Sequence, residues 1–248
     1  MKWTFGIVTD GRTYDNSGRA GEVGSAHKNL KFIYDSIISQ NIDDDYEIII
    51  IGGSDHVADW PNVKYIPFDE NVHPKWISRK KNILVNEVKY ENIALMHDYV
   101  YLCDQWYNSF VEFGEDWDLC NSPTINFNGQ RYRDWITDSN LCPEKDIVFL
   151  DYDDHSRTHQ QYPAMACFYV KKQFFLESGG FDESLMWGCG EDMEWADRVR
   201  PLPWNYKCNP NAVVRFLKYK NNPHWGKKCN TRARFRWNAG ITKPIIMK

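Results

Sequence analysis

Two kinds of segment alternate along the first hundred residues of the chain. Short apolar runs of strand length are residues 5–9, 46–51, 63–66 and 92–96. Segments with apolar residues at helical spacing are residues 26–39 and 76–88. Strands separated by helix-sized segments form βαβ units, in which the strands run parallel. The pattern therefore predicts an α/β fold with a Rossmann-like, mainly parallel central sheet flanked by helices.

The second half of the chain has a less regular pattern. Residues 114–146 are rich in Asp, Asn and aromatic residues, which is typical of loops and short strands. Residues 164–170 predict a buried strand, and residues 172–177 and 192–199 predict short helices. No stretch of linker composition separates the two halves, so we expect one domain, residues 1–248, with two lobes.

Composition places the chain among globular proteins. Hydrophobic residues make up 42% and charged residues 26%. No apolar run approaches the roughly 20 residues of a membrane-spanning helix, and the apolar stretch near Met1 is too short for a signal peptide. The chain contains seven cysteines, an odd number, and no two of them have the CxxC spacing. This pattern favours reduced, mostly buried thiols. We therefore expect a cytoplasmic protein.

Charge is distributed very unevenly. Residues 198–248 contain 13 Lys and Arg and no Asp or Glu, which gives this segment a net charge of +13. The first 197 residues therefore have a net charge of −17, and the whole chain has a net charge of −4. This asymmetry indicates either that the C-terminal segment packs on the acidic body or that it faces an anionic partner. Phosphate groups of a substrate, an anionic membrane surface and nucleic acid are the candidates.

Three groups of carboxylates are candidates for chemistry. Asp98 follows a predicted strand, where a carboxylate can hold Mg²⁺ or Mn²⁺, although a turn or helix-capping aspartate is the alternative. Glu191 and Asp192 follow a glycine-rich turn at a predicted helix start, which suits either helix capping or general-base catalysis. Asp151 and Asp153 form a DxD that could bind metal, but polar flanking residues favour an exposed acidic loop.

Five stretches in order resemble GT-A glycosyltransferases, and they are most similar to the large inverting family 2 group. The stretches are FGIVTD at 5–10, YEIIIIGGSD at 46–55, SRKKN and YENIALMHD at 78–98, AMACF to GGFDE at 164–183, and WGCGED at 187–192. GGFDE followed closely by GED is specific, whereas a lone DxD is not. The resemblance covers the chain up to Arg200. It implies a GT-A fold with a nucleotide-binding lobe (1–100), an acceptor and catalytic lobe (101–200) and a basic C-terminal segment (201–248).

The resemblance also implies roles for individual residues. Asp192 would be the general base, and Glu191 with Trp187 would contact the acceptor. Asp98 would hold Mn²⁺ or Mg²⁺ against the donor diphosphate. The residues expected to bind the nucleotide are Thr9, Asp10, Asp55, Lys81, Asn82, His97 and Lys227.

The sequence departs from the family at the metal motif, where His97-Asp98-Tyr99 contains a single acid. In several GT-A enzymes a C-terminal histidine completes the metal site, and His224 is the candidate, with an ordinary loop histidine as the alternative. We expect the basic segment to close over the donor diphosphate. The rival prediction is a peripheral contact with an anionic membrane or a lipid-diphosphate acceptor.

The resemblance predicts transfer of a sugar from a UDP- or GDP-sugar to a hydroxyl of a glycan or lipid-linked acceptor, with inversion. A sugar nucleotidyltransferase would need a GxGTRx loop, of which Asp10-Gly11-Arg12-Thr13 is only a fragment. A non-catalytic carbohydrate- or anion-binding relative is a further alternative, because the DxD is degenerate. Nucleic acid is not expected as a partner, since the rest of the chain is acidic and contains no recognition motif.

Overall fold

The computed structural model contains one large sheet and one small sheet. It describes residues 1–13, 21–22, 24–53, 55–72, 75–138, 141, 143, 147–161, 163, 165–185 and 190–220. The strands are β1 (Trp3–Val8), β2 (Tyr46–Ile51), β3 (Val63–Ile66), β4 (Asn92–His97), β5 (Val100–Leu102), β6 (Leu119–Asn121), β7 (Thr124–Ile125), β8 (Cys167–Lys171), β9 (Tyr206–Cys208) and β10 (Val214–Phe216). The helices are α1 (His27–Ile38), α2 (Ile77–Glu87), α3 (Trp106–Phe113), α4 (Lys172–Glu177) and α5 (Glu191–Val199), with 3₁₀ turns at η1 (Asp55–Val57) and η2 (Thr158–Gln160).

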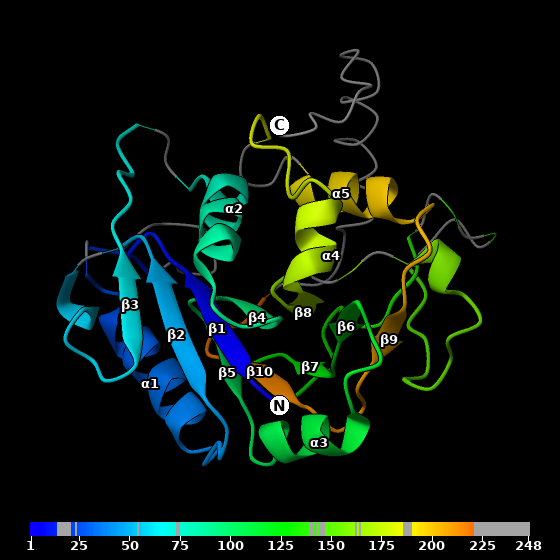
Figure 1. Ribbon diagram of the computed structural model, residues 1–248, viewed down its shortest axis with the longest axis horizontal. Coiled ribbons are helices and arrows are strands. Elements are labelled where there is room, and N and C mark those ends of the chain that lie inside the picture. The colour runs from blue at the N-terminus through cyan, green and yellow to red at the C-terminus, as the bar shows by residue number, and fades with distance from the viewer. Residues whose placement is uncertain are drawn as a thin grey trace.

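The large sheet has the strand order β3-β2-β1-β4-β8-β6-β9 (Figure 1). Strands β1 to β4 pair in parallel, as the alternation of strand and helix segments predicts. Strand β8 runs antiparallel to both β4 and β6, whereas β9 is parallel to β6. The predicted single-domain α/β fold with a mainly parallel sheet flanked by helices is confirmed.

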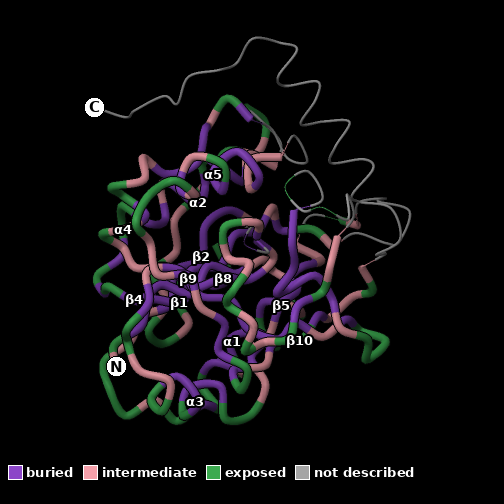
Figure 2. The backbone as a smooth tube through the Cα atoms, turned by 90° about the vertical axis from the view of Figure 1, so that its right-hand side faces the viewer, coloured by how far each residue is buried: buried purple, intermediate pink, exposed green. Residues whose placement is uncertain are grey.

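Both faces of the large sheet are covered by helices (Figure 2). Side chains alternate across a strand, so that Trp3, Phe5 and Ile7 of β1 point to the face that carries α1 and α3. The opposite face holds Ile93 and Leu95 of β4 against α2, α4 and α5. Burial on both faces explains why these strands are continuous apolar runs in the sequence.

The small sheet has the order β5-β10-β7. Strand β10 pairs antiparallel with β5 and parallel with β7, which brings the residues after β10 back to the end of β4. The sequence pattern did not predict β5, β9 or β10, because runs of three residues are too short to show a period. The residues just beyond β10 thus lie near Tyr99 by virtue of pairing.

Three tryptophans from the middle of the chain lie in the core. Trp106 is the first residue of α3 and is fully buried. Its indole Nε1 donates a hydrogen bond of 2.9 Å to the hydroxyl of Tyr169. Trp117 and Trp135 are also buried in the core, which is where large aromatic residues are most often found.

Two observations bear on the predicted class of protein. Within the described residues, no helix is long and apolar enough to cross a membrane. The described cysteines that carry free thiols are Cys103, Cys120, Cys167 and Cys208.

One glycine fixes the approach of β2 to the residue that follows β1. Gly52 has a φ of 88°, and a Cβ there would lie 2.1 Å from the carbonyl oxygen of Thr9. Gly129 has a similar φ of 83°, but a Cβ there would meet nothing within 4 Å. Alanine substitutions at these two glycines therefore separate the strain of a left-handed backbone from the cost of a steric clash.

We predict that Gly52→Ala destabilises the protein by more than Gly129→Ala. Both substitutions incur the left-handed backbone penalty of about 1 kcal/mol, whereas Gly52→Ala adds about 1–3 kcal/mol because the backbone at Thr9 must move. Urea unfolding followed by tryptophan fluorescence measures both changes. Equal free energies of unfolding for the two variants would contradict the close approach.

Candidate active site

The candidate site begins where β1 and β4 end. These strands pair in register with Val8 opposite His97, so the next residues, Thr9 and Asp98, are neighbours. The hydroxyl of Thr9 donates a hydrogen bond of 2.7 Å to Oδ2 of Asp98. The carbonyl oxygen of Thr9 accepts a hydrogen bond of 2.7 Å from Nζ of Lys80, which also pairs with Glu70. Ligands of parallel sheets bind at this edge, beyond the carboxyl ends of the strands.

The Asp98 carboxyl group is half-buried, and burial raises its pKa to about 6. The hydrogen bond from Thr9 and the ammonium group of Lys218 oppose this shift, whereas the charge of Asp10 adds to it. Asp10 therefore lies within electrostatic range of Asp98. The sequence places both acids at strand ends, and the structure brings them together.

Lysine side chains surround the neighbouring residue, His97. Burial lowers the pKa of His97 well below its ordinary value, and positive charges lower it further. The cations within range are Lys81, Lys220, Lys218 and Lys80, in order of effect. The imidazole is consequently neutral at physiological pH, and the charges that act on it most strongly are positive.

Two of these lysines extend over one aromatic ring. The ammonium of Lys218 lies 4.1 Å and that of Lys220 lies 4.9 Å from the ring centroid of Tyr99. Burial and the charge of Lys220 lower the pKa of Lys218 to about 8, while Asp98 and Asp10 act in the opposite direction. The sequence analysis attributed importance to the basic C-terminal segment but did not single out these residues.

A buried lysine connects the strand ends to the start of α5. Lys81 is fully buried, with Nζ 5.0 Å from the ring centroid of Phe181, and donates a hydrogen bond of 3.4 Å to the carbonyl oxygen of Met165. Burial lowers the pKa of Lys81, and the charges of Glu191 and Asp192 oppose that shift. A buried ammonium requires a counter-charge, which this acid pair supplies.

Asp192 lies in the first turn of α5. Gly190 is the N-cap residue, with a φ of 83°, and the first two residues of the helix are Glu191 and Asp192. Oδ1 of Asp192 accepts a hydrogen bond of 2.9 Å from the N–H of Met193. Burial raises the pKa of Asp192, and the ammonium of Lys81 opposes the shift. A half-buried carboxylate of raised pKa is well suited to remove a proton.

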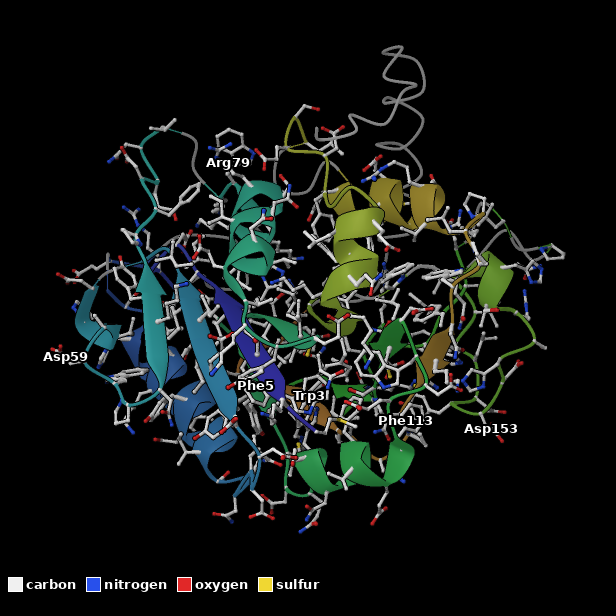
Figure 3. The ribbon with its side chains drawn as sticks, in the orientation of Figure 1. Trp3, Phe5, Asp59, Arg79, Phe113 and Asp153 are labelled. Carbon is white, nitrogen blue, oxygen red and sulfur yellow. The ribbon has the colours of Figure 1, made fainter. Side chains whose placement is uncertain are left out.

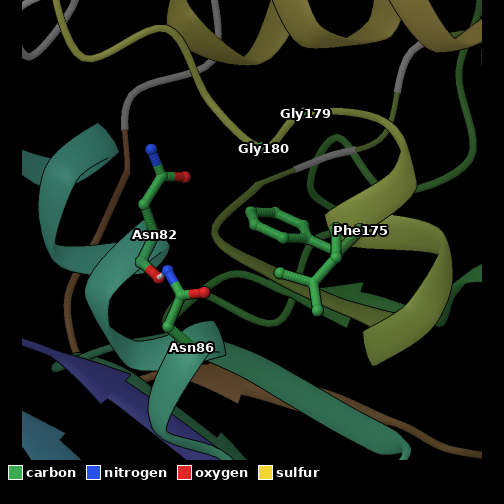
Figure 4. Close-up of a pocket in the computed structure, with 6 residues that line it drawn as sticks. Asn82, Asn86, Phe175, Gly179 and Gly180 are labelled. Atoms are coloured by element: carbon green, nitrogen blue, oxygen red, sulfur yellow. Dashed lines mark hydrogen bonds between the residues drawn. The ribbon is translucent and has the colours of Figure 1, made fainter. Parts of the chain in front are cut away.

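Asn82 has a structural role that the sequence did not predict. Its side-chain amide donates to the carbonyl oxygen of Phe181 and accepts from the N–H of the same residue, both at 2.9 Å. Gly180 makes this contact possible, because a Cβ there would lie 2.8 Å from Oδ1 of Asn82. Asn82 and Gly180 also border a hollow of about 200 Å³ between α2 and α4 (Figure 4). Nucleotide binding by Asn82 stays a prediction.

The remaining predicted residues fall into three groups. Asp55 lies in η1 after β2, and its side chain is 89% exposed. Trp187, His224 and Lys227 lie outside the described residues, so their predicted roles stay predictions. Asp151 and Asp153 are exposed, and Asp153 lies at the outer edge of the molecule (Figure 3). This exposure agrees with the acidic-loop interpretation.

The structure thus brings seven of the predicted residues into one region: Thr9, Asp10, Lys81, His97, Asp98, Glu191 and Asp192. Sequence reasoning missed Lys80, Tyr99, Lys218 and Lys220. The excess of basic residues after Arg198 was the available signal for the last two. Over the part of the chain that is described, no group of three or more His, Cys, Asp or Glu residues is arranged to hold a metal ion.

Comparison with known proteins gives structural similarity only. No protein-family model and no curated protein sequence matches the chain. The structure titled GalNAc-T7 with UDP, GalNAc and Mn²⁺ superposes with a TM-score of 0.62 at 16% identity, over 88% of this chain and 44% of that one. Residues 1–349 of TarS from S. aureus, in complex with UDP-GlcNAc, superpose with a TM-score of 0.59 at 10% identity, over 90% of this chain and 60% of that one.

A further structure of TarS 1–349 gives a TM-score of 0.53 at 11% identity, over 95% of this chain and 64% of that one. The chain spans less than two thirds of the length of each of these proteins. At identities this low, structural similarity establishes the fold and does not establish the chemistry of the site. The protein has the GT-A fold, with its strand ends and first-turn acids at one edge of the sheet.

Proposed function

We propose that the protein is a glycosyltransferase that moves a sugar from a nucleotide-diphosphate sugar to a hydroxyl group. One observation carries the proposal: a half-buried Asp192, paired electrostatically with buried Lys81, lies in the same region as the Thr9–Asp98 strand ends. Structural neighbours that contain UDP or UDP-GlcNAc support a nucleotide-sugar donor. A glycan or lipid-linked molecule is the proposed acceptor.

Asp192 is the proposed general base. As the acceptor hydroxyl oxygen attacks the anomeric carbon, the bond from that carbon to the diphosphate oxygen breaks and Asp192 takes the hydroxyl proton. A single displacement of this kind inverts the anomeric configuration. The products are the glycosylated acceptor and a nucleoside diphosphate, whose negative charge the surrounding lysines stabilise. Glu191, beside the base, and Trp187 are proposed to bind the acceptor.

The proposed donor site follows the strand ends. Thr9, Asp10 and Asp55 would contact the nucleoside, because they follow β1 and β2. His97, held neutral by burial and by the charges of nearby lysines, would lie near the diphosphate. Lys227 is proposed to approach the diphosphate from the basic segment. The rival role for that segment is contact with an anionic membrane surface. Such contact would weaken steeply as the salt concentration rises.

A divalent ion, Mn²⁺ or Mg²⁺, fits the residues at Asp98. Mg²⁺ in phosphate-transferring sites is commonly held by one or two carboxylates together with substrate phosphates. Asp98 and the nearby Asp10 match that donor set. His224 is proposed to add a nitrogen ligand. When bound, the ion would neutralise charge on the leaving diphosphate.

We predict that Asp192→Asn lowers glycosyl transfer by about 10²-fold or more while nucleotide affinity is unchanged, because the amide cannot accept the proton. Release of nucleoside diphosphate from a panel of UDP- and GDP-sugars, with glycan and lipid-linked acceptors, measures the rate. Asp197→Asn is the matched control, because Asp197 lies on the same helix with a 51% exposed side chain. Transfer at the wild-type rate in Asp192→Asn would exclude this base.

We also predict that the acidic limb of the pH–rate profile lies above the ordinary aspartate range near pH 4. Burial raises the pKa of Asp192, and a protonated base is inactive, so the rate rises with pH through that raised pKa. Lys81→Met removes the charge that opposes the shift and should move the limb to higher pH. Asp138 acts on Asp192 in the opposite sense to Lys81 and is unchanged in this variant. A limb that moves to lower pH would contradict the pairing.

For the metal, we predict that Mn²⁺ strengthens the binding of UDP or GDP to the wild-type protein, because Asp98 and the diphosphate share the ion. Asp98→Asn should abolish this enhancement. Calorimetric titration with Mn²⁺ and with excess EDTA measures it, and Asp153→Asn is the control, since Asp153 is exposed in a distant loop. Identical affinities with Mn²⁺ and EDTA would show that Asp98 has another role.

A further inference from the structure

We propose that Lys218 and Lys220, held on the ring of Tyr99, bind the diphosphate group of the ligand directly. The inference rests on the proposed function, because it names the residues that recognise the charged part of the donor. The ligand class is an organic diphosphate. A nucleoside diphosphate is the source that the neighbouring strand ends favour, and a lipid diphosphate is the alternative.

The structure places two positive charges next to one aromatic ring. Both ammonium groups lie within 5 Å of the same ring centroid, at 4.1 Å and 4.9 Å. The negative face of an aromatic ring attracts cations, so Tyr99 holds the two groups together in spite of their mutual repulsion. A diphosphate carries several negative oxygens, whose charge would relieve that repulsion. Lysine acts on phosphate as a mobile point charge, which suits this arrangement.

Backbone pairing holds the lysines in place. The N–H of Leu217 donates to the carbonyl oxygen of Tyr99 at 2.8 Å, continuing the pairing of β10 with β5. The side chain of Asn126 donates to the carbonyl oxygen of Lys220 at 2.7 Å and accepts from its N–H at 2.9 Å. Because the main chain is fixed on both sides, binding would require only the two lysine side chains to adjust.

The position matches a ligand at the sheet edge. Tyr99 directly follows Asp98, and both lysines lie within electrostatic range of His97 at the end of β4. Lys80 and Lys81 approach the same histidine from α2. Lysines from two separate parts of the chain thus converge on the strand ends, where parallel sheets bind ligands. The alternative is that Lys218 and Lys220 serve only as counter-ions of Asp98 and Asp10.

The test is the affinity of the full-length protein for UDP, GDP, inorganic pyrophosphate and geranyl diphosphate, measured by calorimetry with EDTA and with Mn²⁺. Lys218→Met and Lys220→Met keep the aliphatic stem and remove the charge. We expect each to weaken diphosphate binding by about tenfold, which is the scale of one hydrogen bond to a charged group, and the double variant to weaken it further. Binding of UMP should weaken less than binding of UDP.

Lys207→Met is the matched control, because Lys207 lies on β9 and pairs with exposed Asp116. It should leave every affinity unchanged. Lys218→Arg should keep most of the binding, because charge is retained. Thermal unfolding of each variant separates lost binding from lost folding.

The outcomes distinguish this proposal from the proposed function. Unchanged UDP affinity in the folded double variant would overturn the lysine site and support the counter-ion role, even if Asp192→Asn abolishes transfer. Absence of binding by any diphosphate to the wild-type protein would also overturn it. Weakened diphosphate binding without sugar transfer by the wild type would support the lysine site and count against the glycosyltransferase. Weaker binding of geranyl diphosphate alone would assign the lysines to a lipid diphosphate instead of the donor.

Discussion

The parallel pairing of β1 with β4 is the constraint on which the candidate site depends. It places Thr9 beside Asp98, and a hydrogen bond of 2.7 Å joins their side chains. A shift of one residue in this register would turn every side chain of the strand to the opposite face. The buried alternation of Trp3, Phe5 and Ile7 prevents such a shift, so core packing determines where the acid lies. The chemistry at the strand ends therefore depends on the stability of the apolar core beneath it.

Helix α2 serves both sides of the proposed reaction through consecutive residues. Side chains of neighbouring helical residues point about 100° apart, which follows from 3.6 residues per turn. Lys80 consequently reaches the carbonyl oxygen of Thr9, whereas Lys81 lies within range of Glu191 and Asp192. The next residue, Asn82, fixes the turn that contains Phe181, which precedes α5. A single helix thereby positions the strand-end residues and the first-turn acids of α5 relative to each other.

The end of β4 combines a single acidic residue with several nearby lysines. Asp98 has no second acid next to it in the sequence, and burial raises the pKa of its carboxyl group to about 6. Lysines from α2 and from the residues after β10 converge near His97. An anionic leaving group is stabilised by such a field, since ammonium groups in a partly dry site act over short distances with little screening.

The sequence by itself determined the order of strands and helices in the first half, because strands buried on both faces are short continuous apolar runs, whereas amphipathic helices have a period of 3.6 residues. It also identified Asp98, Glu191 and Asp192 as candidates, since they follow recognisable strand ends and glycine turns. Only the tertiary structure decided that Tyr99, Lys218 and Lys220 belong together. Strands β5 and β10 are three residues long, and they meet across more than a hundred residues of chain. Contacts of that kind arise from pairing between distant segments, which a local pattern of apolar residues does not record.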